Sequence, residues 1–395
     1  MSSAASLSST LPQSFPGSRN SALERLEAFL PRAGKHYSET RNFDLGPDGR
    51  TNVSLLSPYT RYKVLSEQDI ASRILQEYSL EDAEKYISEV CWRTYWRGYL
   101  ASRPSIWRNF LKERDDLSEF HADEYERLTS GKTEVACFDD WAAELKQTGY
   151  LHNHARMWFA SIWVYHFQLP WQLGAGFFLD HLIGGDPASN TLSWRWVAGL
   201  HTQGKHYIAR SSNIKKFTKG RFQPKNLELD TDDAPDFQRQ PPEKVLASLP
   251  DKKEGKKLIL LPDDYTADIY LDADALENVL IVHPSACGMH ATDLKKKFWD
   301  ELTSDCEQRL QERYDSLRLE VIHRASELKS LLSDGGWLVY EPDVGPSADL
   351  LASLDLPASS VHKLRRSWDS QFFPHCQKGF FGLKKEIPDL LTSLI

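Results

Sequence analysis

Tryptophan is concentrated in one part of the chain, because nine of its twelve tryptophans lie between Trp92 and Trp196. Over residues 81–100 and 154–167, apolar and aromatic residues recur at three- and four-residue spacing, as on one face of a helix. No alternating strand pattern interrupts residues 20–222. Large aromatic rings dominate buried area, but they also line pockets for flat ligands. The region is therefore predicted to be helical, with an aromatic core and a pocket for a flat aromatic ligand as open alternatives.

The length of 395 residues predicts two domains rather than one core. The segment 223–257 is rich in Pro, Asp, Glu and Lys and cannot bury enough surface to fold alone. After it, short β-type runs alternate with helical stretches, which predicts an α/β domain with a mostly parallel sheet. The β-type runs are residues 257–261, 278–283 and 337–340, and the long helical stretch is 294–325.

Composition narrows the class of protein and its compartment. The longest apolar runs are far shorter than a bilayer span, so we expect a soluble protein with no membrane contact. The first twenty residues lack a secretory signal, and they are read as a flexible tail, with an organellar transit role as the alternative. Five scattered cysteines suggest neither disulfides nor a cluster and favour the cytoplasm. The net charge of −8 means that any nucleic acid must bind through a local basic face.

Two segments carry polar and aromatic side chains that could belong to a binding site. Residues 37–43 and 54–59 place hydroxyls and backbone amides ahead of a helix, where a pyrophosphate can be held. On a helix, Glu89, Trp92 and Arg93 lie at i, i+3 and i+4 and face one direction. Each segment alone also fits a structural role, namely a capped helix start and a surface ion pair beside a core tryptophan.

Two further segments are richer in defined residue types. Residues 149–157 include His152 and His154, which could be metal ligands or a general base, but no Cys or carboxylate spacing supports this. A structural role is therefore preferred for both histidines. Residues 184–190 are followed by the Trp-Arg-Trp triplet 194–196. Asp186 could equally be a helix cap, and Asn190 could equally be a turn residue.

In this order, the four segments resemble the flavin domain of DNA photolyases and cryptochromes over about residues 20–222. Segment 149–157 is the most specific, since five residue types and one aromatic position recur at fixed spacing. The resemblance implies a mostly α fold, in which an all-helical FAD-binding domain of photolyase/cryptochrome type is followed by a smaller α/β domain. The expected organisation is a tail at 1–20, the helical domain at 21–222, a linker at 223–257 and the α/β domain at 258–395. Because the family's antenna domain usually comes first, the last domain is either a relocated antenna-type domain or an unrelated binding module.

The resemblance also implies roles for individual residues, with FAD as cofactor, an unknown antenna chromophore and no metal. The implied cofactor-binding residues are Tyr37, Ser54, Leu55, Leu56, Ser57, Tyr86, Glu89, Arg93, Tyr150, Asn153, Arg156, Gly184, Gly185, Asp186 and Asn190. The implied catalytic residues are Glu89, Asn153, Trp194 and Trp171, the last two as inner links of an electron-transfer chain. The implied substrate-binding residues are Glu89, Trp92, Met157 and Trp196. Asn153 and Met157 point to cyclobutane pyrimidine dimers, since enzymes for the (6-4) lesion carry histidines at these two places.

The chain departs from the family pattern at three places. Leu55 stands where the family has an arginine, which weakens the expected phosphate grip. Gly184 stands where the family has an aspartate that pairs with the arginine equivalent to Arg156, and a buried guanidinium without a partner is costly. No third tryptophan is found at the expected place near residue 118. These departures put the tuning of the flavin and the outer part of the electron route in question.

The resulting hypothesis is a light-driven photolyase that repairs cyclobutane pyrimidine dimers in damaged DNA as a monomer. The alternatives are a cryptochrome-like photoreceptor that binds FAD without repair, and a degenerate flavin fold kept for interaction. Residues 368–381 are aromatic and could pack against the flavin domain, although core packing is the preferred reading. A basic run after the fourth segment is the candidate for contact with DNA phosphates, and the alternative is that these residues only form a solvated surface. Its members are Lys205, Arg210, Lys215, Lys216, Lys219, Arg221 and Lys225.

Overall fold

The computed structural model of the chain describes residues 14–225, 227, 229, 231, 235–237, 239–271 and 276–395. Most of the tail expected at 1–20 and parts of the linker expected at 223–257 lie outside the described residues. The first helix begins at Arg19, inside the range expected as a tail, and the side chain of Ser18 caps it by accepting from Ser21 N. Just before it, Phe15 is buried and the amide of Gly17 donates to Glu301 Oε2 at 2.7 Å. Residues 14–18 are therefore packed against the rest of the molecule.

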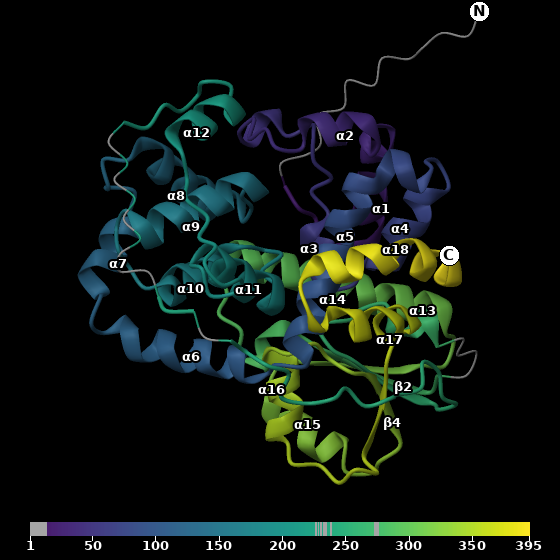
Figure 1. The fold of residues 1–395 in the computed structure, drawn as a ribbon. Helices are drawn as coiled ribbons and strands as arrows, with labels where there is room; N and C mark the ends of the chain where they lie inside the picture. The colour runs from purple at the N-terminus through teal and green to yellow at the C-terminus, as the bar shows by residue number, and fades with distance from the viewer. Residues whose placement is uncertain are drawn as a thin grey trace, which may run out of the picture.

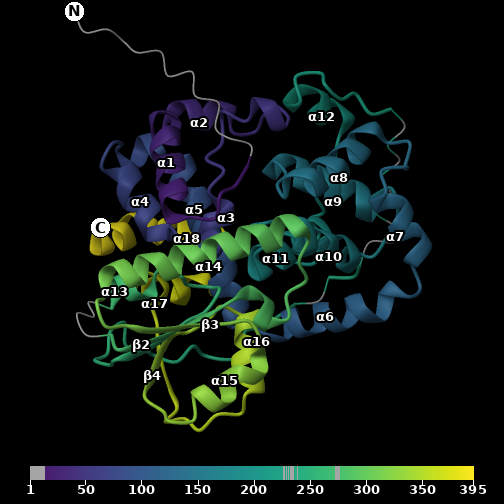
Figure 2. The same ribbon diagram turned by 180° about the vertical axis from the view of Figure 1, so that it is seen from behind.

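A helical unit follows, as the sequence predicted, and the views in Figures 1 and 2 show its helices gathered above the sheet. The two helical stretches expected from periodicity are α5 and α9, and polar side chains cap both: Ser79 accepts from Asp82 N, and His152 from His154 N. None of the helices in the described part of the chain is long and apolar enough to span a bilayer. The helices are α1 (Arg19–Phe29), α2 (Lys35–Thr40), α3 (Ser57–Arg61), α4 (Glu67–Leu75), α5 (Leu80–Ala101), α6 (Ser105–Ser118), α7 (Ala122–Thr129), α8 (Ala136–Thr148), α9 (Asn153–Tyr165), α10 (Trp171–His181), α11 (Pro187–Val197) and α12 (Ser211–Phe217).

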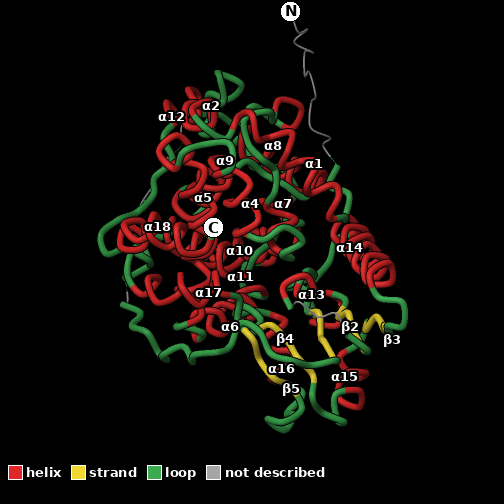
Figure 3. Tube along the Cα trace, turned by 90° about the vertical axis from the view of Figure 1, so that its right-hand side faces the viewer, coloured by secondary structure: helices red, strands yellow, loops and turns green. Residues whose placement is uncertain are grey.

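The second unit is built on a parallel sheet with the strand order β3-β2-β1-β4-β5, and Figure 3 shows these strands gathered at one end of the molecule. Every strand pair is parallel, and the register places Leu258 opposite Val279 and Leu338. The predicted α/β unit with a parallel sheet is therefore confirmed. The elements are β1 (Lys257–Leu260), α13 (Ala267–Tyr270), β2 (Asn278–Val282), α14 (Asp293–Arg313), β3 (Arg318–Ile322), α15 (Ala325–Leu331), β4 (Trp337–Tyr340), α16 (Pro346–Ser353), β5 (Val361–Leu364), α17 (Ser367–Phe372) and α18 (Phe380–Leu394).

The two faces of the sheet belong to different hydrophobic cores. Leu258 and Leu260 face the large core that the sheet shares with the helical unit, whereas Ile259 and Leu261 face a smaller core on the opposite side. Helix α14 runs between the sheet and the helical unit, and α15 lies on the far side (Figure 2). Alternate residues of the strand thus serve opposite layers, as the pleat of a strand requires.

The expected helical stretch 294–325 is wrong in its last third. Helix α14 ends at Arg313, and residues 318–322 form β3 at one edge of the sheet. Charged and apolar residues alternate in this strand, so that it resembles the charged helix before it more than a buried strand. The other edge strand, β5, is equally polar and was not predicted.

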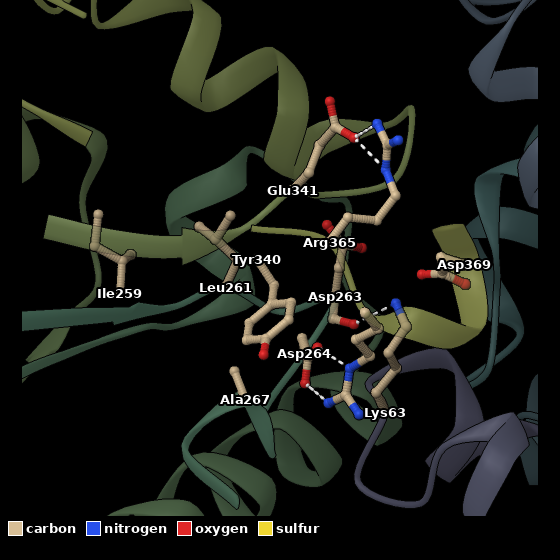
Figure 4. Close-up of a pocket in the computed structure, with 11 residues that line it drawn as sticks. Lys63, Ile259, Leu261, Asp263, Asp264, Ala267, Tyr340, Glu341, Arg365 and Asp369 are labelled. Atoms are coloured by element: carbon tan, nitrogen blue, oxygen red, sulfur yellow. Dashed lines mark hydrogen bonds and ion pairs between the residues drawn. The ribbon is translucent and has the colours of Figure 1, made fainter. Parts of the chain in front are cut away.

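Buried charges join the two units. The guanidinium of Arg97 on α5 contacts Glu67 at 3.1 Å, Asp343 at 2.7 Å and Asp369 at 2.6 Å. Burial opposes its charge, but the three carboxylates together raise the pKa of Arg97. Figure 4 shows neighbouring charged side chains, including Lys63 and Asp263, around a cavity of about 10 Å³, which leaves room for about one water molecule. The junction between the two units is therefore tightly packed, and its cavity has no room for a ligand larger than a water molecule.

The end of the chain returns to the helical unit, where α18 lies against α5 (Figure 1). Leu383, Ile387 and Leu391 on one face of α18 are buried. The side-chain amide of Gln68 donates from Nε2 to the carbonyl of Leu394 at 3.0 Å, and Lys384 pairs with Glu84 at 2.6 Å. The C-terminal helix is thus held along α5, the helix that carries the second sequence motif.

Candidate functional site

Tyr37 of the first segment meets Tyr86, which lies three residues before Glu89 on α5, at one end of the site. The ring of Tyr37 on α2 stands edge-on to that of Tyr86 on α5, with centroids 5.0 Å apart and an interplanar angle of 87°. The Ser54 side chain lies near enough to Tyr86 to lower the pKa of its phenol slightly against the effect of burial. Burial raises the pKa of both tyrosines. This corner therefore presents neutral rings and hydroxyls rather than charge.

The carboxyl group of Glu89 is paired with a residue that was not among the predicted site residues. Arg41, at the end of α2, donates from Nη1 to Glu89 Oε1, and both side chains stay about one-third exposed. Burial raises the pKa of Glu89, and the charge of Arg41 partly offsets this effect. Arg41 lies inside the first segment, at residues 37–43, but nothing in its spacing showed that it would reach Glu89 across the site.

The turn before α3 and the loop before α11 touch each other. Leu55 is buried in this turn with φ of 56°, in the left-handed region that non-glycine residues rarely adopt. Leu56, also buried, follows it, and Ser57 opens α3. A Cβ atom at Gly184 would lie 2.8 Å from the carbonyl carbon and oxygen of Ser57. The absence of an aspartate at 184 is therefore tied to a backbone contact that leaves no room for any side chain.

Asp186 combines the two roles that the sequence left open. Its Oδ1 accepts from Ser189 N at 2.6 Å and so caps α11, while its Oδ2 lies 3.3 Å from Nη1 of Arg93. Burial alone would raise the pKa of this carboxyl, but Arg93 and Arg61 lower it overall. The carbonyl of the preceding Gly185 accepts from Arg61 Nε at 3.2 Å. Asp186 is thus a charged carboxylate held at the start of α11.

Arg156 has no carboxylate partner among the described residues. Its Nε donates to the carbonyl of Leu151 at 2.8 Å, and its guanidinium lies 5.3 Å from the ring centroid of Tyr150. A second guanidinium, that of Arg50, lies 4.7 Å from the same centroid but is paired with Glu144. Burial lowers the pKa of Arg156 to about 10. A partly buried cation with free donors is an attractive site for an anionic group.

The first turn of α9 carries the remaining residues of the third motif. Asn153 is exposed at its first position and Met157 is half-buried one turn later. His152 Nε2 lies 3.1 Å from the carbonyl oxygen of Arg41, and His154 Nδ1 lies 2.8 Å from that of Asn42. Both histidines therefore tie α9 to the end of α2, in line with the structural role preferred from the sequence.

The fourth motif places an amide and an indole along α11. Asn190 donates from Nδ2 to the carbonyl of Ala175 at 2.9 Å, which leaves its Oδ1 for another partner. Trp194 is buried one turn further on. Trp171 is also buried, at the start of α10, but no ring contact joins it to Trp194 within the described ranges. The two predicted electron-transfer residues therefore belong to different aromatic clusters.

The two tryptophans expected to line the substrate pocket have different neighbours. Trp196 is half-buried and packs against Tyr207 at 5.4 Å. Trp92 is covered on one ring face by Phe380, the first residue of α18, with centroids 3.8 Å apart and an interplanar angle of 12°. The aromatic segment 368–381 thus contributes directly to the candidate site, whereas the preferred sequence reading was core packing alone.

The basic run after α11 lies on the surface. All seven of its lysines and arginines are exposed, and of these Arg221 pairs with the buried Asp44 at 2.5 Å. The apolar side of the segment is anchored by the buried Ile214. Among the described residues the other six form no ion pair, so their charges are available to an anionic surface.

The donor set fits an anionic, partly aromatic cofactor. Arg156 brings guanidinium donors with no carboxylate among the described residues, whereas Nη1 of Arg93 is already ion-paired with Asp186 at 3.3 Å. Tyr150 supplies a ring beside Arg156, and Tyr37 and Tyr86 supply a second pair of rings. Residues from all four segments thus border one region, and the guanidinium of Arg156 is the cation in it that has a carboxylate partner nowhere among the described residues.

Comparison with known proteins agrees with this chemistry. Residues 86–253 match the family model described as the FAD binding domain of DNA photolyase. A deoxyribodipyrimidine photo-lyase from Thermus thermophilus is 34% identical over 200 residues, which cover 50% of this chain and 46% of the relative. One from Vibrio cholerae is 30% identical over 191 residues, which cover 47% and 40%. The resemblance to photolyases and cryptochromes that the motifs predicted is confirmed.

The similarity is partial in both sequence and structure. The chain spans less than half the length of these curated relatives. A crystal structure of a class III photolyase from Agrobacterium tumefaciens is similar with a TM-score of 0.43 and 28% identity, covering 51% of this chain and 43% of the other.

Proposed function

We propose that this chain binds FAD and uses blue light to split cyclobutane pyrimidine dimers in DNA. The observation that carries the proposal is the convergence of four separate motifs around Arg156, a guanidinium without a carboxylate, beside Tyr150. When bound, a reduced FAD would supply the light-excited electron donor for this reaction. We further propose that the protein acts as a monomer in the cytoplasm, where its five free cysteines suit a reducing compartment.

The cofactor would be held by the residues of the turn before α3 and by the three cationic or acidic groups around it. Ser54, Ser57 and the amides of this turn are the proposed phosphate ligands. Arg156 would pair with negative charge on the flavin, since it has no acid of its own. Asp186 would keep Arg93 in place, and the free Oδ1 of Asn190 would accept from the flavin edge.

The substrate would be met by Glu89, Trp92, Met157, Trp196 and Asn153. Released from Arg41 and protonated, the carboxyl of Glu89 would donate a hydrogen bond to a base carbonyl that is gaining negative charge. A dimer must leave the duplex to reach such groups, and the cost of extrusion is lowest for damaged bases. The exposed basic run would hold the DNA backbone without reading its sequence.

A second candidate function is a light sensor that binds FAD without repair. The specific observation in its favour is the stacking of Phe380 on Trp92, which occupies one face of a proposed lesion wall. It also connects the candidate site directly to the C-terminal helix, through which a signal could leave. In this case α18 would respond to light, and no dimer would be split.

The Glu89→Gln variant tests the proposal at its substrate side. We expect it to retain bound FAD and to repair a dimer-containing oligonucleotide several-fold more slowly, because the amide can still donate a hydrogen bond but has no acidic proton to share with the developing negative charge. Glu24→Gln, at an exposed position on α1, is the matched control and should repair as the unmodified protein does. Equal repair by both variants would contradict the role of Glu89, and flavin that binds without any repair by the unmodified protein would favour the sensor.

A further inference from the structure

Trp194 forms an indole pair with a residue that none of the motifs contains. The rings of Trp194 and Trp163 meet edge to face, with centroids 6.2 Å apart and an interplanar angle of 88°. Both side chains are buried. A Cβ atom at Gly174 would lie 2.3 Å from Cη2 of Trp194 and 3.0 Å from Cδ2 of Trp163. The pair is therefore seated on helix α10 at a point that has room for glycine only.

The aromatic series continues from Trp163 toward the surface. The ring of Tyr125 on α7 lies with its centroid 6.0 Å from that of Trp163, at an angle of 74°. Tyr125 is half-buried, so it is accessible to a reductant in solution. Asp180 lies near enough to act on Tyr125 electrostatically, and with burial it raises the pKa of the phenol to about 12. The three rings form a stepwise path from the interior to the surface.

The path expected from the sequence, through Trp171, is less favourable. Trp171 is stacked on Phe110, at 5.5 Å and 24°, and a phenylalanine ring is much harder to oxidise than an indole or a phenol. The guanidinium of Arg195 lies 5.8 Å from the ring centroid of Trp171. A fixed positive charge at this distance raises the energy of a radical cation on Trp171. No cation lies over the ring of Trp163 or Trp194 among the described residues.

We propose that Trp163 and Tyr125 complete the electron route to the flavin, in place of the missing third tryptophan. This inference rests on the proposed binding of FAD. Trp194 would give one electron to a bound flavin, which would supply the light-excited acceptor, Trp163 would give one electron to Trp194, and Tyr125 would give one electron to Trp163. Tyr125, which is half-buried, releases its phenolic proton to water. An external thiolate then returns one electron to Tyr125, a proton from the solvent restores the phenol, and two thiyl radicals combine as a disulfide.

The test uses the full chain with oxidised FAD bound, illuminated with blue light in the presence of a thiol. Trp163→Phe and Tyr125→Phe are the relay variants, and Trp171→Phe interrupts the alternative path. Trp158→Phe is the matched control, because Trp158 is equally buried on the same helix but pairs with Trp141. The readouts are the rate of flavin photoreduction, the tyrosyl radical detected by electron paramagnetic resonance, and the flavin content and melting temperature in the dark.

We expect both relay variants to photoreduce their flavin slower by an order of magnitude or more, and Tyr125→Phe to lose the tyrosyl signal. Trp158→Phe should behave as the unmodified protein does. If Trp163→Phe fails to hold flavin, Tyr125→Phe decides, since it removes only a hydroxyl. Normal photoreduction in Tyr125→Phe together with its loss in Trp171→Phe would overturn the relay and leave the proposed function standing. An unmodified protein that binds no flavin would overturn both.

Discussion

The indole of Trp92 and the phenyl ring of Phe380 are stacked with their centroids 3.8 Å apart and their planes inclined by 12°. The contact joins α5 to the first residue of α18, and neighbouring bonds hold it. The hydroxyl of Tyr95 donates to the carbonyl of Lys378 at 2.8 Å, and Arg103 donates from Nη2 to that of Gln377 at 2.8 Å. A base that is to stack on this face of Trp92 must first displace Phe380.

Phe380→Ala should therefore expose Trp92 and strengthen binding of dimer-containing DNA. Loss of a buried phenylalanine ring costs roughly 3–5 kcal/mol of unfolding free energy. We expect a red shift of tryptophan fluorescence and a lower dissociation constant for the damaged oligonucleotide. Phe381→Ala is the matched control, since Phe381 is 76% exposed and Phe380 only 5%. If Phe380→Ala does not fold, Phe380→Leu replaces it, and unchanged DNA affinity in the folded variant would contradict the shielding role.

Gly184→Ala should destabilise the contact between the loop before α11 and the turn before α3. The added methyl group would meet the backbone of Ser57, which cannot move as a flexible side chain would. Overpacking of this kind costs about 1–3 kcal/mol, to be measured by chemical denaturation. Gly382→Ala is the control, because a Cβ atom there meets nothing within 4 Å and alanine favours helix. Equal stability of the two variants would show that the backbone contact at Gly184 can yield.

Arg156→Gln should weaken FAD binding without weakening the fold. A hydrogen bond to a charged group contributes about 1.5–3 kcal/mol, which corresponds to a loss of affinity of about 10- to 100-fold. The unliganded protein should be as stable as before or more stable, because a cation without a carboxylate is removed. Titration of the flavin and thermal unfolding measure the two effects. Arg108→Gln, at an exposed position of α6, should change neither, and a large fall in stability for Arg156→Gln would mean that the arginine is structural.

His152 should make the protein sensitive to mild acid. Burial lowers the pKa of His152 to about 4, below its ordinary value of about 6.5. Between about pH 6.5 and pH 4, His152 is therefore protonated in the unfolded chain but not in the folded one. The free energy of unfolding is highest above pH 6.5 and falls as the pH is lowered from about 6.5 to 4. The expected slope for this residue is about 1.4 kcal/mol per pH unit, and His152→Gln should flatten it. The exposed His36→Gln is the control, and an identical slope in both variants would contradict the assignment.

The sequence predicted regular elements better than it predicted the contacts between them. Helices α5 and α9 and strands β1, β2 and β4 were expected because their apolar periodicity is strong over their whole length. Strands β3 and β5 were missed because edge strands carry polar residues on their open side. The pairing of Arg41 with Glu89 and the stacking of Phe380 on Trp92 were missed for another reason. Both are tertiary contacts between distant segments, and no local pattern encodes them.

The boundaries of the domains and the roles of the site residues stay predictions. The resemblance placed the motifs in one site by analogy, and their side chains do border one region around Tyr150, Arg156 and Asp186. The reason for Gly184 became visible only in three dimensions, where Ser57 approaches it closely. From the sequence, Gly184 indicated only the loss of a carboxylate, whereas in the structure it satisfies a packing requirement.

The most direct measurement is the light-dependent repair of an oligonucleotide that contains one cyclobutane pyrimidine dimer, with chemically reduced protein whose absorption spectrum is recorded beforehand. We expect a flavin spectrum, repair under blue light and no repair in the dark. A flavin spectrum without repair would contradict the photolyase proposal and favour the light sensor. A protein that takes up no flavin when FAD is supplied would contradict the assignment of the whole site.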